Sequence, residues 1–132
     1  MSVRPHLLSF DSIKESRGDL SFLEELKGVP FEVKRVYWLT SVPEQQTRGG
    51  HAHKTGEQVI VAIQGAVEVV LENQSGEILS FTLDSPDQGL YLPPYWWGRM
   101  LFKKKAILLG LASDEFSEED YIRDRKDFDG KA

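Results

Sequence analysis

Residues 48–65 read RGGHAHKTGEQVIVAIQG, and this stretch decides the fold. Two histidines, His51 and His53, stand two positions apart just after a pair of glycines. Residues at i and i+2 of a β-strand point to the same face, so both imidazoles are expected to project together. The β-branched run 58–63 comes next and is followed by Gly65, a pattern typical of a strand that ends at a turn.

Short strands separated by turn signals continue on both sides of this stretch. Residues 33–39 alternate, which places Arg35 and Tyr37 on one face of a strand. Residues 73–76, Asn-Gln-Ser-Gly, are a strong turn signal between two further strands. Short strands at such regular spacing predict an antiparallel sandwich or barrel. The predicted strands are residues 33–39, 58–63, 66–72, 78–83, 90–92 and 106–112.

Two short helical segments are expected outside these strands. Ser117 can cap a helix near the C-terminus, because the acids at 118–120 fall in its first turn, where they favour the helix dipole. Residues 22–27 are expected to form one further turn of helix. Asp120 and Arg123 stand three residues apart and are predicted to pair on the helix surface or at an interface.

Composition limits the class of protein. A chain of 132 residues fits one domain, over residues 1–132. It contains no cysteine, which excludes disulfides and thiolate chemistry and suits a reducing cytoplasm. The first residues lack the apolar core of a signal peptide, and no run approaches membrane-spanning length, so we expect a cytoplasmic protein without membrane contact. The net charge of −5 argues against nucleic-acid binding, although a locally basic pocket can still hold an anionic small ligand.

The paired histidines, a following acid or amide, and a glycine at the end of the next strand resemble the first motif of the cupins. In that family the histidines and a glutamate often bind a metal inside a β-barrel, and a last histidine comes from a second motif. The resemblance implies an all-β fold, a small cupin or jelly-roll antiparallel β-barrel with a short C-terminal helix.

Two positions depart from the cupin metal site. Aligning Gly65 with the last glycine of the motif puts Gln58 at the glutamate position, and Gly98 stands where the second motif supplies a histidine. Glu57 neighbours Gln58 on a strand and is expected to point to the opposite face. Two histidines and a neutral amide make a poor divalent site. We therefore expect no metal and no other cofactor, and favour acid–base chemistry by imidazole, whose unperturbed pKa is about 6.5; a metal site and two purely structural histidines are the alternatives.

Six strings between residues 8 and 128 together carry a narrower resemblance. They are similar to the bacterial dTDP-4-keto-6-deoxyglucose 3,4-ketoisomerases, which relocate a sugar ketone from C4 to C3. Such enzymes supply a 3-keto sugar that a PLP-dependent aminotransferase converts to a 3-amino-3,6-dideoxyhexose for surface glycans. These proteins usually carry Trp-His late in the chain, whereas here Trp97 is followed by Gly98. The strings are DSIKESRG at 11–18, KRVY at 34–37, RGGHAHK at 48–54, LDSP at 83–86, LAS at 111–113 and DYIR at 120–123.

The implied reaction assigns catalytic roles to three residues. The carbonyl at C4 acidifies the hydrogen at C3, so isomerisation needs a base, a stabilised enediolate and proton delivery to C4. The resemblance favours His51 as the base, whereas spacing alone leaves His51 and His53 to divide removal and delivery. Tyr37 is expected to donate a hydrogen bond to the developing charge or to relay a proton, unless it is simply an interior aromatic.

The remaining predicted site residues are expected to bind the dTDP-linked keto sugar. Arg48 is the first choice for the diphosphate or sugar oxygens, because arginine matches phosphate with two parallel hydrogen bonds. Arg35 shares a strand face with Tyr37, which favours a lined cavity. Arg17 is equally well explained as a turn residue. The aromatic residues 95–97 form a cluster that could stack on thymine, although such clusters are more often core or interface. The substrate-binding set is Arg48, Arg35, Arg17, Lys54, Gln58 and Trp97.

Two other functions stay open beside the ketoisomerase. One is a dTDP-sugar 3,5-epimerase, which keeps the ketone at C4, and the other is a noncatalytic sugar-binding cupin. The resemblance and the aromatic excess imply a homodimer.

Overall fold

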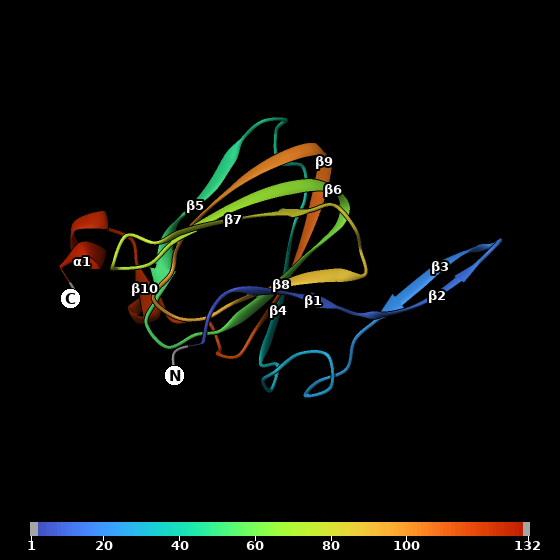
Figure 1. Cartoon of the computed structure of the whole chain (residues 1–132), viewed down its shortest axis with the longest axis horizontal. Coiled ribbons are helices and arrows are strands. Elements are labelled where there is room, and N and C mark those ends of the chain that lie inside the picture. The colour runs from blue at the N-terminus through green and yellow to red at the C-terminus, as the bar shows by residue number, and fades with distance from the viewer. Residues whose placement is uncertain (1–2, 131–132) are drawn as a thin grey trace.

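Strands alternate with turns along residues 3–130, the part of the chain that the computed structural model describes. The limits of the predicted domain, residues 1 and 132, lie outside this part, so the one-domain assignment stays a prediction. The elements in chain order (Figure 1) are β1 (His6–Ser9), β2 (Asp11–Glu15), β3 (Gly18–Phe22), β4 (Arg35–Leu39), β5 (Thr47–His53), β6 (Gln58–Glu72), β7 (Ile78–Leu83), β8 (Gln88–Leu92), β9 (Trp97–Ala112), the 3₁₀ turn η1 (Glu118–Asp120), β10 (Tyr121–Ile122) and α1 (Arg125–Asp129).

The two longest strands, β6 and β9, pair antiparallel along most of their length and organise the sheet. Its strand order is β1-β8-β6-β9-β5-β10, with β4 also on β9 and β7 also on β6. The first half of β9 therefore pairs with β5 and the second half with β4, so the sheet curls around an interior (Figure 1). The predicted all-β antiparallel barrel is confirmed.

Gly65 lies inside β6 rather than at its end. The two strands predicted at 58–63 and 66–72 are one strand, and the register with β9 shifts on both sides of Gln64. Gly65 has a φ of +72°, and a Cβ there would lie 2.6 Å from the carbonyl oxygen of Lys104. The glycine thus marks a β-bulge that bends the strand without breaking it.

Alternation along β6 divides the apolar core into two clusters. Ile60 points into the barrel interior, where it packs among Phe102 and Leu108. Val59 and Val61 point the other way and pack beneath the segment that precedes β4, which contributes Val29 and Phe31. A third, smaller cluster lies under α1 and joins Ala52, Trp97, Ile122 and Phe128.

The C-terminal helix is present but begins later than predicted. Ser117 makes no side-chain capping bond, and residues 118–120 form only η1 because β10 pairs with β5 directly afterwards. The helix α1 is capped instead by Asp124, whose carboxylate accepts the backbone N–H of Lys126 at 2.8 Å. No helix within residues 3–130 combines the length and the apolar character needed to cross a bilayer.

The N-terminal hairpin was not predicted. Strands β2 and β3 form a separate two-stranded sheet that projects away from the barrel, on the side opposite α1 (Figure 1). After β3 the predicted helical turn at 22–27 is only a hydrogen-bonded turn, in which the N–H groups of Lys27 and Gly28 donate to Glu24.

Candidate active site

A cavity of about 290 Å³ opens inside the barrel. Its walls come from β4, β5, the two long strands and β10, so it joins residues that are far apart in the sequence. Six of the nine predicted site residues line it, namely Arg35, Tyr37, Arg48, His51, His53 and Gln58.

The other three predicted residues lie elsewhere in this chain. Arg17 is at the tip of the β2–β3 hairpin, where its side chain is 89% exposed and pairs with Glu15. Lys54 follows β5 with an exposed side chain. Trp97 is buried against Phe128 on the outer side of the barrel wall.

Strand β4 supplies Arg35 and Tyr37 to the same wall, as its alternation predicts. The Tyr37 ring lies directly over Gly110 of β9, where a Cβ would come within 2.1 Å of the ring carbon Cζ. The absence of a side chain at Gly110 therefore makes the room for this ring. Burial raises the pKa of Tyr37 to about 12, so the hydroxyl keeps its proton.

Strand β5 carries the histidine pair behind a bulge. The register with β9 shifts between Gly49 and His51, and a Cβ on Gly49 would lie 2.7 Å from the carbonyl oxygen of Gly98. Bulges re-aim side chains, and here both imidazoles face the cavity, with ring centroids 5.3 Å apart. The i, i+2 spacing thus produces the shared face that the sequence predicts.

The two histidines have different surroundings. His51 makes no side-chain hydrogen bond within residues 3–130, and its ring packs edge-on to Tyr121. Burial, followed by the charges of His53 and Arg123, lowers the pKa of His51 to about 4. His51 is therefore a neutral imidazole at physiological pH, with its ring nitrogens available to a ligand.

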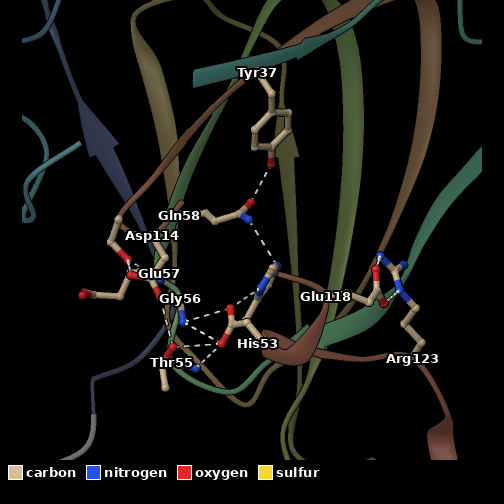
Figure 2. Close-up of polar contacts among 11 residues, drawn as sticks. Tyr37, His53, Thr55, Gly56, Glu57, Gln58, Asp114, Glu118 and Arg123 are labelled. Atoms are coloured by element: carbon tan, nitrogen blue, oxygen red, sulfur yellow. Dashed lines mark hydrogen bonds and ion pairs between the residues drawn. The ribbon is translucent and has the colours of Figure 1, made fainter. Parts of the chain in front are cut away.

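His53 is held at both ring nitrogens. Its Nδ1 lies 2.9 Å from Oδ2 of Asp120, and its Nε2 lies 3.2 Å from Nε2 of Gln58. The Tyr37 hydroxyl donates to Oε1 of Gln58 at 2.6 Å. Figure 2 shows Tyr37, Gln58 and His53 in line along the cavity wall.

Asp120 was predicted to pair with Arg123, and this prediction is wrong. Arg123 pairs instead with Glu118 (Figure 2), while Asp120 faces His53 because β10 pairs Tyr121 with His53 and so brings the preceding residue beside the ring. Burial alone would raise the pKa of Asp120, but hydrogen bonds from Thr55 and His53 outweigh it and lower the pKa. The carboxylate is therefore charged.

Arg35 brings an unpaired cation to the cavity. Its Nε is buried and has no hydrogen-bond partner within the described part of the chain. The guanidinium lies over the rings of Tyr37 and Phe116, 5.7 and 5.6 Å from their centroids. A buried donor without a partner is costly, so this group is well suited to meet an anionic oxygen of a ligand.

The residues present do not fit the divalent metal that cupin barrels often hold. Within residues 3–130 no three His, Asp or Glu side chains converge, and both nitrogens of His53 are already engaged. Glu57 points out of the cavity, where it accepts a hydrogen bond from Tyr91.

Three aromatic or charged residues of the cavity lie outside the predicted site set. Trp96 rather than Trp97 faces the cavity, and Tyr121 and Arg123 reach it from β10 and the residue after it. Trp96 and Trp97 are adjacent, so they take opposite faces, and only the start of β9 decides which one faces inward. For Tyr121 the sequence does contain a signal, since DYIR was part of the family resemblance, but nothing local indicated its contact with the histidines.

Comparisons with known proteins agree with this geometry. The family model FdtA, described as WxcM-like, C-terminal, matches residues 3–132. A TDP-4-oxo-6-deoxy-alpha-D-glucose-3,4-oxoisomerase of Aneurinibacillus thermoaerophilus is 42% identical over 124 residues, which cover 92% of this chain and 88% of that protein.

Solved structures match over the whole described fold. QdtA, a sugar 3,4-ketoisomerase of Thermoanaerobacterium thermosaccharolyticum in complex with TDP, has a TM-score of 0.94 and 35% identity, covering 100% of this chain and 96% of that one. A histidine-to-asparagine mutant of the same enzyme, in complex with TDP-4-keto-6-deoxyglucose, has a TM-score of 0.93 and 34% identity over the same shares of the two chains.

Proposed function

This chain belongs to the family of bacterial dTDP-sugar 3,4-ketoisomerases, and on that premise we propose that it converts dTDP-4-keto-6-deoxy-D-glucose to the 3-keto isomer. It is thus an isomerase, which moves a carbonyl between neighbouring ring carbons. The curated relative carries this substrate in its name, and a structural relative binds TDP-4-keto-6-deoxyglucose.

The observation that carries the mechanism is the difference between the two histidines. His51 has free ring nitrogens and is held neutral, whereas His53 already binds Asp120 and Gln58. A general base needs an available lone pair within reach of the proton. His51 therefore serves as the base, a choice that the sequence spacing left open.

The reaction moves two protons in all. His51 removes the hydrogen on C3, and the electron pair spreads over C3, C4 and the carbonyl oxygen O4 as an enediolate. A proton is then delivered to C4, while the hydroxyl proton lost from O3 is balanced by one gained at O4. The unpaired guanidinium of Arg35 supports the enediolate step, since fixed donors in a dry site stabilise developing negative charge.

The size and charge of the cavity suit the sugar part of the substrate. At about 290 Å³ it is at the lower end of the range for ligand pockets, so we place the sugar inside and the nucleotide at the mouth. Arg48 lines the cavity from the exposed part of β5, which supports its assignment to the diphosphate.

The test is NMR spectroscopy of dTDP-4-keto-6-deoxyglucose and protein in D₂O, with an aminotransferase present to trap the labile 3-keto product. A 3-amino sugar confirms ketoisomerisation. Deuterium at C3 and C5 with the ketone still at C4 would identify a 3,5-epimerase, and binding without exchange would identify a noncatalytic protein.

His51→Asn should keep dTDP binding and lose turnover by about 10²- to 10⁴-fold, because its amide cannot accept the proton.

We further propose that the reaction needs no metal, because the donor set around His51 and His53 lacks a third ligand. Protein treated with a chelator should keep its full rate and contain no stoichiometric metal by elemental analysis. Loss of activity that one divalent ion restores would refute this proposal.

The wider setting follows from the same family. We propose that a PLP-dependent aminotransferase consumes the 3-keto product, for surface-glycan synthesis, and that both enzymes work in the cytoplasm, a compartment that suits a chain without cysteine. We also propose a homodimer, supported by apolar side chains exposed on β4 and the N-terminal hairpin.

A further inference from the structure

A hydrogen-bond chain runs from Tyr37 through Gln58 to His53 (Figure 2) and ends at the carboxylate of Asp120. Its direction follows from the Asp120 end. A carboxylate only accepts, so Nδ1 of His53 carries the proton of that contact. The Gln58 amide places its NH₂ group 3.2 Å from Nε2 of His53, so Nε2 is the acceptor of that contact. The amide oxygen is thereby turned to Tyr37, whose hydroxyl donates to it at 2.6 Å. Each donated proton in the chain therefore points along it toward Asp120.

This direction decides what Tyr37 offers a ligand. Its proton is committed to Gln58, so its free lone pairs are the group presented to the cavity. Such an oxygen can accept a hydrogen bond from a sugar hydroxyl. The hydroxyl at C3 is the one that must lose its proton when the new carbonyl forms, so an acceptor beside it would assist the reaction.

We infer that Asp120 is a positioning residue for the reaction, which acts through His53 and Gln58 to keep the Tyr37 hydroxyl an acceptor toward the substrate. The inference deepens the proposed function and rests on it, since only a reacting sugar makes the direction of the chain matter. It differs from the sequence prediction, in which Tyr37 donated to the developing charge.

Asp120 itself is held tightly in place. Its Oδ1 accepts the backbone N–H and the hydroxyl of Thr55 at 2.7 and 2.9 Å. The backbone N–H of Gly56 lies 3.3 and 3.2 Å from the two carboxylate oxygens. A Cβ on Gly56 would lie 2.7 Å from Oδ2, so only glycine leaves room for the contact between Asp120 and His53.

These contacts predict what Asp120→Asn does. The backbone N–H of Thr55 requires an oxygen at Oδ1, and the N–H of Gly56 can donate to that same oxygen, so the new NH₂ group occupies the Oδ2 position and faces Nδ1 of His53. Nδ1 then becomes an acceptor and the proton moves to Nε2. Gln58 has to turn its oxygen to that proton and its NH₂ to Tyr37, so the hydroxyl proton swings toward the cavity. The substitution therefore reverses the donor and acceptor roles along the chain while the same residues stay bonded to one another.

The first experiment reads the tautomer of His53 by NMR spectroscopy of protein with ¹⁵N-labelled histidine, with signals assigned through His6→Gln and His51→Asn. Wild-type protein should show the Nδ1–H tautomer of His53, and Asp120→Asn the Nε2–H tautomer. Asp114→Asn is the matched control, because Asp114 lies 3.0 Å from the same Thr55 hydroxyl and shares its one proton with Asp120, but does not bond to His53. An Nε2–H tautomer in wild-type protein, or an unchanged tautomer in Asp120→Asn, would overturn the inference.

The second experiment measures turnover. Asp120→Asn should lower kcat by about 10²-fold or more with little change in KM, as expected when the Tyr37 hydroxyl turns from an acceptor into a donor toward the reacting hydroxyl, whereas Asp114→Asn should stay near wild type. In a Tyr37→Phe background the same substitution should lower kcat little further, because the Tyr37 hydroxyl through which Asp120 acts is already absent. Independent, multiplying effects of the two substitutions would contradict an action through Tyr37.

A third variant covers the case in which Asp120→Asn fails to fold. Gln58→Leu interrupts the chain between His53 and Tyr37, so it should keep the Nδ1–H tautomer and still lose turnover. Normal turnover in this variant would refute the inference. The tautomer measurement does not depend on activity: if wild-type protein shows the Nδ1–H tautomer and no isomerisation, the proposed function fails while the chain direction stands.

Discussion

His51 and His53 are chemically identical side chains on one strand face, yet their neighbours give them separate tasks. His51 is buried without a side-chain hydrogen bond in residues 3–130, so its charged form is disfavoured and its lone pair stays free. His53 is hydrogen-bonded to a carboxylate and an amide, so its ring is held in one orientation and neither ring nitrogen is free to act as a base. A site that needs one free base and one fixed imidazole thus obtains both from a single HAH string.

At the residue scale, the lowered pKa of His51 predicts that the pH–rate profile of kcat/KM is flat on its acid side. The base works in its neutral form, and burial lowers its pKa to about 4, so kcat/KM should stay level from neutral pH down to about 5 and fall only as pH drops through about 4. A pH–rate profile measures this, together with a ¹H NMR titration of His51. An inflection near the unperturbed value of about 6.5 would show that burial does not control the base.

Arg48 is the second test at this scale. If it contacts the diphosphate with charge-assisted hydrogen bonds, Arg48→Ala should weaken dTDP binding by about 1.5–3 kcal/mol in calorimetry. Arg99→Ala is the matched control, because Arg99 is exposed on β9 near the same glycine bulge but lies outside the cavity. Equal affinity in the two variants would move Arg48 to the sugar or to solvent.

At the element scale, glycines let the two long strands bend around the cavity. Gly65 allows β6 to bulge against the backbone of β9, and Gly110 leaves space on β9 for the Tyr37 ring. Both lie opposite atoms that a Cβ would strike, so both positions need glycine for space, and Gly65 needs it for its positive φ as well.

Gly65→Ala and Gly76→Ala separate these two causes. Both glycines have positive φ, +72° and +88°, which costs a side chain about 1–2 kcal/mol. A Cβ at Gly76 meets nothing within 4 Å, whereas one at Gly65 strikes backbone of Lys104 and Ala106. Gly65→Ala should therefore lower the free energy of unfolding by clearly more than Gly76→Ala, in denaturant unfolding. Equal losses would mean that the bulge relaxes without cost.

At the scale of the whole molecule, β4 and the N-terminal hairpin both expose apolar side chains. β4 pairs with β9 as its one partner strand among residues 3–130, and Val36 and Trp38 on its outer face are 48% and 65% exposed. The projecting hairpin adds Ile13 and Leu20, which are also exposed. Exposed apolar edge strands favour association, and these features support the proposed homodimer.

Trp38→Lys tests the dimer without touching the cavity, because Trp38 points away from the face that carries Tyr37. Wild-type protein should sediment as a dimer, and Trp38→Lys should shift toward monomer, since a charge in an apolar interface is costly. Ile78→Lys is the control, because Ile78 is similarly exposed but lies on β7. A monomeric wild type would refute the proposed dimer, and a dimeric Trp38→Lys would place the interface elsewhere.

The sequence by itself determined the family, the antiparallel barrel and the shared face of His51 and His53. These follow from alternation and from short motifs, because side-chain direction along a strand depends only on local backbone geometry. The place of Arg35 and Tyr37 on one cavity wall came from the same rule.

Only the tertiary structure decided the contacts that separate the two histidines. Asp120 lies 67 positions from His53, and the pairing of β10 with β5 brings them together. The start of β9 decides that Trp96 faces the cavity instead of Trp97, and the same β10 pairing ends η1 and delays the helix. The register between segments far apart in the sequence depends on which faces the assembled core buries, so it is decided only when those segments come together.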